Sequence, residues 1–419
     1  MIKARKKITY FTRKRKIVVP ILILYILNRR GLTNKMELED FIEKVDNPNE
    51  LPNVTASALL KQRMKLNPEI FVDMNDEIMR DFYTLHSDEV KTFKGYVLTA
   101  EDGSDWEVPN TPETRKNNKT KTNQCARMKV SNCYDLLNKH ILDTQVESYK
   151  YSEIKLAQRH LEKIDNLNLL GTFKSITVRD RGYSCLRLMY DSIKSNQKFV
   201  VRAKKTDYKY EQSTMTSDDE WVEIGFRSER MRHYKDKDPE LYEYFAKGNT
   251  LRVRIVKVKL KTGEIEILLT NLESEEFNTE DIVEIYRLRW GIETSYHHLK
   301  ENMKMTNISS SKLDLIKQDI YSQMLVANML QAIANEAEAE IDQEEYKHKM
   351  KVNMNMAIGY IKRYLLLILL EKSRKKRNEL YEELEEKILK NIIPIREGRT
   401  FDRSKKTKNK HHSNKRKSF

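Results

Sequence analysis

The stretch SITVRDRGYSCLRLMYDSIKSNQKFVVRAKK, residues 175–205, decides the fold. It begins with a short β-branched run that stops at Asp180, and the letters RGY that follow are typical of a turn. The next run, SCLRLMYDSIK, has the spacing of an amphipathic helix, and KFVVRAKK is β-branched again. A strand, a helix and a strand in this order indicate a mixed α/β core.

Three runs before this stretch also have the character of strands. They are KGYVLTAEDGS at 94–104, RMKVSNCYDLL at 127–137 and KHILDTQVESY at 139–149. The first ends in Asp-Gly, a strong hairpin signal, so we expect a turn there, and the three together predict an antiparallel meander. The amphipathic run at 151–164 predicts a helix with Ser152 as its N-cap.

The predicted secondary structure changes twice after this region. Residues 206–280 are rich in alternating β-type runs, whereas helical patterns resume at about residue 279. The predicted fold class is therefore α/β, a mixed-sheet core with an inserted β-rich subdomain and helical regions at both ends. The expected divisions are a helical N-terminal DNA-binding region with a basic arm (1–90), a core in two parts (91–205 and 279–335), the β-rich insertion (206–278), a helical C-terminal region (336–394) and a basic tail (395–419).

The N-terminal region contains one strongly apolar run, IVVPILILYIL, at 17–27. A run of about 11 residues is too short to span a bilayer, and Pro20 interrupts it. We therefore expect a buried helix and no membrane association, with a signal peptide as the alternative. Thr55 precedes an amphipathic run and is a candidate N-cap. The three cysteines of the chain have no metal-ligand spacing, which favours a reducing, cytoplasmic compartment.

The positive charge of the chain is concentrated at its two ends. Of a formal net charge of +15, residues 1–17 and 403–419 each contribute eight Lys or Arg and no acid. A smaller basic cluster contains Arg115, Lys116, Lys119 and Lys121. Flexible basic arms on a balanced body favour a nucleic-acid partner, and termini that serve only solubility are the alternative.

Two acids stand at the ends of predicted strands, where open α/β sheets place their ligands. Asp180 ends the SITVR strand and precedes Gly182; an ordinary aspartate in a β-to-α turn is the alternative. Asp102 lies in AEDGSDWEVPN, where a purely structural hairpin turn is the alternative. Glu101 and Asp105 compete with it as nearby acids. Acids of this kind suit phosphodiester chemistry, because paired Mg²⁺ ions prefer hard oxygen ligands.

The stretch YRLRWGIETSYHHLK at 286–300 places a single acid among bases and aromatic residues. On one regular helix, four polar residues share a narrow arc: Tyr286, Arg289, Glu293 and Lys300. The apolar face beside this arc contains Ile285, Leu288, Ile292, Tyr296 and Leu299. One acid aligned with two bases and a phenol suits a phosphate backbone beside a metal site. A surface ion pair between Arg289 and Glu293 at i,i+4 is the alternative.

The segment 286–300 resembles the Tyr-x2-Arg-x3-Glu-x6-Lys signature of bacterial insertion-sequence transposases of the DDE class, in the fourth insertion-sequence family. Four segments extend the resemblance: ASALLKQRMKLNPEIF, AEDGSDWEVPNTPE, VRDRGYSCLRLMYDSIKSNQKFVVRAKK and LLTNLESEEFNTEDIVEIYRLRW. The resemblance covers roughly residues 18–330, and the acid-bearing segments occur in the order found in the family.

This resemblance implies a ribonuclease-H-like mixed-sheet core with a β insertion before the final acid. The residues that it implies to be catalytic and to bind two Mg²⁺ ions, with Mn²⁺ as a substitute, are Asp102, Asp180 and Glu293. The residues that it implies to contact DNA phosphates are Tyr286, Arg289 and Lys300.

The sequence departs from the family at one position. Some members hold a flipped base with a tryptophan just before the LLT run. This chain has Ile267 directly before LLT and Glu266 before that. Either it does not cut the second strand through a DNA hairpin, or another aromatic residue such as Trp221 or Trp290 does this work.

The expected function is that of a DNA transposase. It would bind the terminal inverted repeats of its element, cleave at the ends by metal-dependent hydrolysis and join the 3′-hydroxyl to target DNA. The expected partners are double-stranded DNA, as both transposon ends and target, and a second copy of the chain in a synaptic homodimer. The bacterial nucleoid is the expected location. The alternatives are a metal-dependent endonuclease without strand transfer and a non-catalytic DNA-binding regulator.

Overall fold

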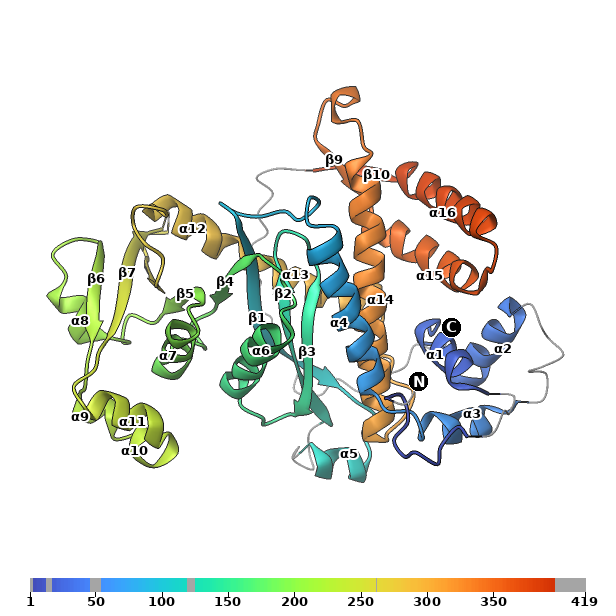
Figure 1. The fold of residues 1–419 in the computed structure, drawn as a ribbon, viewed down its shortest axis with the longest axis horizontal. Helices are drawn as coiled ribbons and strands as arrows, with labels where there is room; N and C mark the ends of the chain where they lie inside the picture. Colours follow the sequence, from blue (N-terminus) through green and yellow to red (C-terminus); the bar gives the residue numbers. More distant parts are fainter. Residues whose placement is uncertain (1–2, 13–16, 46–53, 119–124, 261, 396–419) are drawn as a thin grey trace.

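The computed structural model describes residues 3–12, 17–45, 54–118, 125–260 and 262–395. An eight-stranded mixed sheet with the order β3-β2-β1-β4-β5-β8-β7-β6 forms the centre of the molecule (Figure 1). The strands are β1 (Tyr96–Glu107), β2 (Arg127–Asp135), β3 (Ile141–Ser148), β4 (Lys174–Arg179), β5 (Lys198–Ala203), β6 (Asp219–Ile224), β7 (Leu251–Lys259) and β8 (Ile265–Thr270). The predicted mixed α/β class is confirmed.

The first five strands of the sheet follow the predicted pattern. Strands β1, β2 and β3 pair antiparallel and form the expected meander. Strand β4 pairs parallel with both β1 and β5. Helix α7 (Leu186–Lys194) connects β4 to β5, so the stretch at 175–205 is a βαβ unit. Helix α6 (Glu153–Leu167) leads from β3 to β4 and begins at the predicted Ser152, whose side chain makes no capping hydrogen bond.

The turn predicted at Asp102 and Gly103 is wrong. Strand β1 continues through this dipeptide to Glu107, because β2 pairs with it along its whole second half, including Gly103 with Ser131. The glycine instead permits a close approach: a Cβ on Gly103 would lie 2.9 Å from Oε1 of Glu153 on α6. An Asp-Gly pair indicates a turn only where no neighbouring strand takes up its backbone groups.

The β-rich segment extends the same sheet. Strand β8 pairs antiparallel with β5, and β7 and β6 follow it. Four short helices lie beside these strands: α8 (Lys209–Thr214), α9 (Ser228–Met231), α10 (Tyr234–Lys237) and α11 (Pro239–Ala246). They form the lobe at the left of Figure 1, whose buried residues include Phe245 and Ile255.

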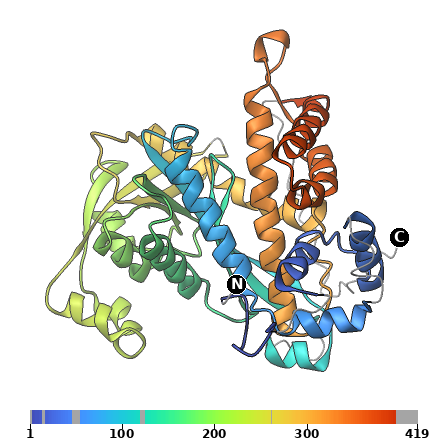
Figure 2. The same ribbon diagram turned by 45° about the vertical axis from the view of Figure 1, so that its right-hand side comes forward.

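Helices cover the other end of the molecule. Helices α4 (Glu69–Leu85) and α14 (Leu313–Ala339) lie side by side across the sheet in both ribbon views (Figures 1 and 2). The remaining elements are α1 (Val19–Leu27), α2 (Asn34–Lys44), α3 (Ala56–Arg63), α5 (Pro112–Asn117), α12 (Thr279–Leu288), α13 (Trp290–His297), the π-helix η1 (His298–Asn302), the 3-10 helix η2 (Gln343–Glu345), β9 (Met350–Val352), α15 (Met354–Leu370), α16 (Arg374–Leu389) and β10 (Ile392–Pro394).

The N-terminal helices are fixed to α14 by buried charge. Arg29 and Arg63 both bind Asp319, the latter at 2.6 Å, and all three side chains are almost fully buried. The apolar run at 17–27 forms the buried helix α1 as predicted, and Thr55 caps α3 by accepting from the Ala58 N–H. Among the described residues, no helix combines the length and apolarity needed to cross a bilayer.

Parts of the basic arms cannot be placed on this fold. Residues 13–16 of the N-terminal arm and the whole tail at 403–419 lie outside the described residues. Lys119 and Lys121 of the smaller basic cluster also lie outside them, whereas Arg115 and Lys116 are in the last turn of α5.

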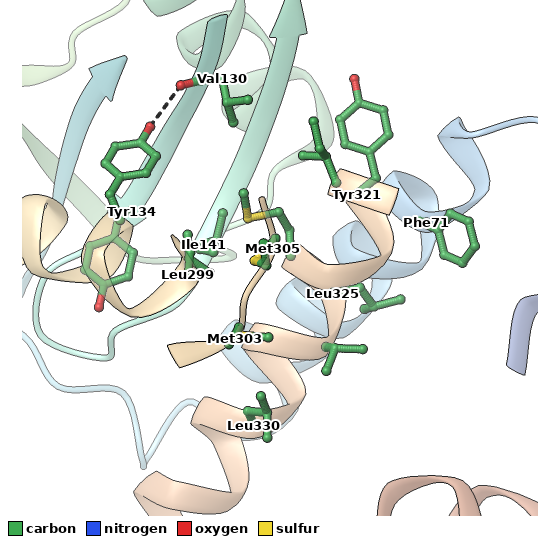
Figure 3. Close-up of a cluster of buried hydrophobic side chains, with 14 of the residues drawn as sticks. Phe71, Val130, Tyr134, Ile141, Leu299, Met303, Met305, Tyr321, Leu325 and Leu330 are labelled. Carbon is green, nitrogen blue, oxygen red and sulfur yellow. Dashed lines mark hydrogen bonds between the residues drawn. The ribbon is translucent and has the colours of Figure 1, made fainter. Parts of the chain in front are cut away.

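The main core lies between the sheet and α14. Figure 3 shows Tyr134 and Ile141 from the sheet, with Leu299 beside them, on one side of α14, whose Leu325 and Leu330 belong to the same cluster. Alternation along β1 divides its residues between two clusters. Leu98 and Ala100 pack in the same cluster as Ile292 of α13, whereas Val97 packs in another with Ile164 of α6. Helices α13 and α6 therefore cover opposite faces of β1.

Candidate active site

The register of β1 and β4 brings Asp102 and Asp180 together. The parallel pairing ends with Glu101 opposite Arg179, and the two aspartates are the next residues on their strands. Asp102 follows Ala100 by two positions and Asp180 follows Val178 by two, so both continue the face that α13 covers. Their charges interact, because Asp180 contributes to raising the pKa of the Asp102 carboxyl.

The environment of Asp102 disfavours its charged form. Burial is the main cause, and together with the negative charge of Asp180 it raises the pKa of the Asp102 carboxyl to about 7. The N–H of Gly103, which donates to Oδ1 at 2.8 Å, and the charge of Arg289 oppose this shift. In Asp180, Oδ1 accepts from the N–H of Gly182 at 2.7 Å. This hydrogen bond fixes the start of the turn after β4.

The two acids that compete with Asp102, Glu101 and Asp105, each form an ion pair with another residue. Glu101 is buried and accepts from Nε of Arg179 at 2.6 Å, on the opposite face of β1. Asp105 pairs with Nζ of Lys129 at 2.8 Å, near the exposed end of the strand. Asp102 is thus the acid of this group that stands beside Asp180.

The single regular helix predicted for 286–300 is wrong. Helix α12 ends at Leu288, α13 begins at Trp290, and the π-helix η1 follows from His298. At the join between α12 and α13, backbone hydrogen bonds connect residues three apart instead of four, for example from the N–H of Ile292 to the carbonyl of Arg289. The predicted polar residues are therefore distributed over three helical segments and the join between the first two.

A close contact accompanies this break. A Cβ on Gly291 would lie 3.2 Å from Cδ2 of Leu136, just beyond the end of β2, so the glycine lets α13 approach the sheet. Glu293 stands one turn into α13 and its side chain is 35% exposed. It therefore faces partly into solvent next to the sheet face that carries Asp102.

Arg289 connects Glu293 to the aspartates. Its Nη2 donates to Oε1 of Glu293 at 2.7 Å, and its guanidinium lies 5.8 Å from the centre of the Tyr286 ring. The predicted i,i+4 ion pair is therefore present. Burial opposes the charge of Arg289, but Glu293, Tyr286 and Asp102 together raise the pKa of its guanidinium. Arg289 is thus close enough to both Glu293 and Asp102 to feel the charge of each.

Lys300 and Tyr296 hold the end of this helical segment on β1. Nζ of Lys300 donates to Oγ of Ser104 at 2.6 Å and to the Asp105 carbonyl at 3.1 Å. The hydroxyl of Tyr296 donates to the Asp102 carbonyl at 2.7 Å and accepts from the Asn132 N–H at 3.0 Å. It is also 3.2 Å from the Val130 carbonyl oxygen.

The polar role of Tyr296 was not predicted. Its place on the apolar face was correct, since it is buried in the main core. The only available signal was its identity, because a buried tyrosine usually places its hydroxyl on a hydrogen-bond partner.

Glu266 and Arg202 were also missed as neighbours of this site. They pair at 3.2 Å on β8 and β5, and Glu266 is buried. Burial raises the pKa of the Glu266 carboxyl, and the charges of Arg202 and Arg289 oppose it. Glu266, one residue before the family's tryptophan position, therefore lies close to Arg289. Of the two tryptophans considered as substitutes, Trp221 of β6 stacks with Arg252 of β7, and Trp290 is 49% exposed beside the join.

The donor set is suited to a hard divalent cation. Carboxylate oxygens are the ligands that Mg²⁺ and Mn²⁺ prefer, and a cation beside Asp102 would offset the burial and repulsion that raise its pKa. Among the described residues, no group of three or more His, Cys, Asp or Glu is arranged to hold a metal ion. Asp102 and Asp180 are side by side, and the Glu293 carboxylate is bound to Arg289.

Comparisons with known proteins identify the family. Residues 94–329 match the family model described as the transposase DDE domain. The transposase InsG for insertion sequence element IS4 of Escherichia coli (strain K12) is 22% identical over 335 residues, which are 77% of this chain and 71% of that protein. The putative transposase InsL for insertion sequence element IS186A of the same strain is 29% identical over 86 residues, 20% of this chain and 23% of that protein. Among solved structures, a piggyBac transposase synaptic complex with hairpin DNA aligns with a TM-score of 0.41 and 9% identity, covering 89% of this chain and 79% of that chain.

The family model spans more than half of the chain and includes all three predicted acids. The family implies dependence on a divalent metal and binding to DNA. The chain therefore belongs to the DDE transposases of insertion sequences, in the group of the IS4 transposase, and is an enzyme that cleaves and joins DNA.

Proposed function

We propose that this transposase binds the terminal inverted repeats of its own element, cleaves at the ends by hydrolysis and joins the freed 3′-hydroxyl to target DNA. The observation that carries the proposal is the parallel register that sets Asp102 beside Asp180, on the face that the helix of Glu293 covers. We infer that Glu293 joins these two aspartates at the same edge of the sheet, because phosphoryl transfer needs concentrated negative charge for metal binding.

The topology supports a ribonuclease-H-like core. Five strands have the order β3-β2-β1-β4-β5. Strands β4 and β5 run parallel to β1, β2 is antiparallel to β1, and β3 is antiparallel to β2. This is the arrangement expected of that fold. Strands β6 to β8 come between this core and the final acid in the sequence. We keep the division into a helical N-terminal region, a two-part core, an insertion at 206–278, a C-terminal helical region and a basic tail.

We propose that Asp102, Asp180 and Glu293 hold two Mg²⁺ ions, for which Mn²⁺ can substitute. When bound, such ions activate the attacking oxygen and stabilise the charge that develops on phosphorus. Arg289 holds the Glu293 carboxylate by a hydrogen bond of 2.7 Å. Tyr296 fixes the backbone of β1 at Asp102, so that this carboxyl cannot turn away with its strand.

DNA phosphates would meet the bases and the phenol beside these acids. Tyr286, Arg289 and Lys300 are the proposed contacts, and Lys300 would exchange its hydrogen bond with Ser104 for one with a phosphate. The basic arms would add affinity that falls with salt. Two ends must be joined in one reaction, so we propose a homodimer in the synaptic complex.

Cleavage of DNA that carries the flanking ends of the element tests this function. Wild type should cut at the ends in Mg²⁺ or Mn²⁺, whereas Glu293→Gln should lose cleavage by more than about a hundredfold and still bind the ends. Glu284→Gln is the matched control, because it removes an exposed acid of α12 that pairs only loosely with Arg287. Equal cleavage by wild type and Glu293→Gln would rule out the proposed site.

A second assay with a pre-cut end separates the alternatives. Joining of its 3′-hydroxyl to target DNA is expected of a transposase with the proposed activity. Cleavage without joining would indicate an endonuclease, and binding without either would indicate a regulator.

A further inference from the structure

A buried chain of hydrogen bonds connects α6 to the backbone of Asp102. Nδ1 of His160 lies 2.6 Å from Oδ2 of Asp143, and its Nε2 lies 3.0 Å from Oγ of Ser131. Ser131 Oγ in turn lies 3.2 Å from the Asp102 carbonyl oxygen, as donor to it. The side chains of Ser131, His160 and Asp143 are each at most 1% exposed. None of them had been singled out in the sequence.

The arrangement has the connectivity of a Ser-His-Asp triad but not its function. A nucleophilic serine must reach a substrate, whereas Ser131 is enclosed between β1 and α6 and bonded to a backbone carbonyl. The role of these three side chains must therefore come from the group to which Ser131 is bonded, which is the backbone carbonyl of Asp102.

Both ring nitrogens of His160 have a buried polar partner. Burial opposes ionisation of Asp143, but hydrogen bonding from His160 and the charge of Lys163 lower the pKa of its carboxyl. The Asp102 carbonyl can only accept, so the Ser131 hydroxyl is the donor in that contact, and Nε2 of His160 is the other polar partner of Ser131 Oγ.

Lys163 holds Asp143 from the other side. Nζ of Lys163, one turn along α6, donates to Oδ1 of Asp143 at 2.8 Å and lies 2.8 Å from Oδ1 of Asp76 on α4. Lys163 thus bridges two carboxylates in this buried cluster, and His160 adds a further hydrogen-bond partner for Asp143.

The Asp102 carbonyl is bound from both faces of the sheet. Tyr296 donates to it from α13, and Ser131 donates to it from the side of α6. Two donors on one carbonyl oxygen fix the orientation of the peptide, and with it the direction of the carboxyl that follows from the same Cα.

We propose that His160 is a positioning residue for the transfer reaction: held by Asp143, it orients the Ser131 hydroxyl onto the Asp102 carbonyl and so fixes the Asp102 carboxylate. This role rests on the proposed function of Asp102. His160 itself touches neither DNA nor metal. Its effect is on the geometry of the site, where displacement of a reacting group by about 1 Å costs on the order of a hundredfold in rate.

Two substitutions of His160 separate positioning from simple support of Asp143. His160→Gln can place its amide N–H₂ where Nε2 stands and keep the contact with Ser131. His160→Asn can place it where Nδ1 stands and keep the contact with Asp143 instead. In single-turnover joining of a pre-cut end, we expect His160→Asn and Ser131→Ala to be slower than wild type by about tenfold to a hundredfold, and His160→Gln to be several-fold faster than His160→Asn.

Stability and DNA binding provide the controls. Thr144→Val removes another buried hydroxyl of the same sheet, which donates to Oδ1 of Asn132 at 2.9 Å and has no contact with Asp102. Its joining rate should equal that of wild type when both are compared at the same folded fraction. If Ser131→Ala matches Thr144→Val, or if His160→Asn is as fast as His160→Gln, the positioning role is wrong.

A spectroscopic measurement is independent of activity. In nitrogen-15 spectra of labelled histidine in the metal-free protein, Ser131→Ala should shift the Nε2 resonance of His160 more than its Nδ1 resonance. An Nε2 resonance that Ser131→Ala leaves unchanged would overturn the inference even in an active enzyme. If wild type fails to join DNA, the proposed function fails, and the ring resonances still decide whether His160 contacts Ser131.

Discussion

The phenol oxygen of Tyr296 lies 2.7 Å from the backbone carbonyl oxygen of Asp102, and 194 residues separate the two along the chain. Tyr296 is three positions after Glu293 on α13, so this hydrogen bond ties the helix of the last proposed acid to the strand of the first. The distance between two proposed metal ligands therefore depends on a residue that is not itself among the proposed metal ligands or DNA contacts.

Tyr296→Phe tests this connection. The change keeps the buried ring but removes the donor to Asp102 and the acceptor for the Asn132 N–H. We expect a loss of about 1–3 kcal/mol in the free energy of unfolding and a fall of about tenfold or more in the rate of end cleavage. Tyr83→Phe is the matched control, because it removes a buried hydroxyl that donates to Asp135 at 2.5 Å, away from the site. Both should lose stability in denaturant titrations, and equal cleavage by the two variants would contradict the connection.

Asp102 should make the stability of the metal-free protein depend on pH. Its pKa rises from 3.8 to about 7 in the folded state, so between about pH 4 and 7 the folded protein binds a proton that the unfolded chain releases. This contribution to stability is present below pH 4 and is lost as pH rises through 7.

Asp102→Asn removes that dependence. It should be more stable than wild type at pH 8 by a few tenths to about 2 kcal/mol, because partial exposure of the carboxyl weakens the effect. This advantage should shrink as pH falls from 7 and disappear below about pH 4. Thermal unfolding from about pH 4 to 8 measures it, with Asp105→Asn as the control on the same strand. Mg²⁺ should raise the Tm of wild type more than that of Asp102→Asn; a larger effect on the variant would exclude Asp102 as a ligand.

Arg289→Gln should weaken binding to the element's ends. Arg289 is close to two proposed metal ligands, and its guanidinium would also pair with a DNA phosphate bound at this site. The slope of log K against log salt should fall by about 1, and affinity should fall for all sequences alike. Arg287→Gln removes an exposed arginine two residues earlier, which pairs with Glu284 at 3.8 Å, and should leave the slope unchanged. Binding titrations at several salt concentrations distinguish a phosphate contact from an arginine that serves only to hold Glu293.

Local patterns predicted the parts of this structure that depend on neighbours in sequence. The β-branched and amphipathic runs at 175–205 predicted β4, α7 and β5, because alternation and helical spacing are encoded within a few residues. The Asp-Gly pair at 102 and 103 misled because its conformation depends on pairing with β2. The break near Gly291 depends on contact with Leu136. Ser131 and His160 could not be found at all, because hydrogen bonds between distant segments leave no periodic signal.

Gly291 offers the sharpest test of the placement of Glu293. In Gly291→Ala the new methyl would lie 3.2 Å from Cδ2 of Leu136 and must push α13 outward or displace that side chain. The gain in helix propensity, about 1 kcal/mol, offsets part of the steric cost, so the free energy of unfolding should change little. The cleavage rate should nevertheless fall by about tenfold to a hundredfold, because Glu293 moves with the helix.

Gly359→Ala on α15 is the paired control for this experiment. A Cβ there has no atom within 4 Å, so the same change should stabilise the protein by about 0.5–1 kcal/mol and leave cleavage unaltered. Unfolding in denaturant and single-turnover cleavage are measured on both variants. If Gly291→Ala cleaves as fast as Gly359→Ala, the approach of α13 to the sheet does not set the position of Glu293, and the acid must be placed by the hydrogen bonds of Arg289 and Tyr296 alone.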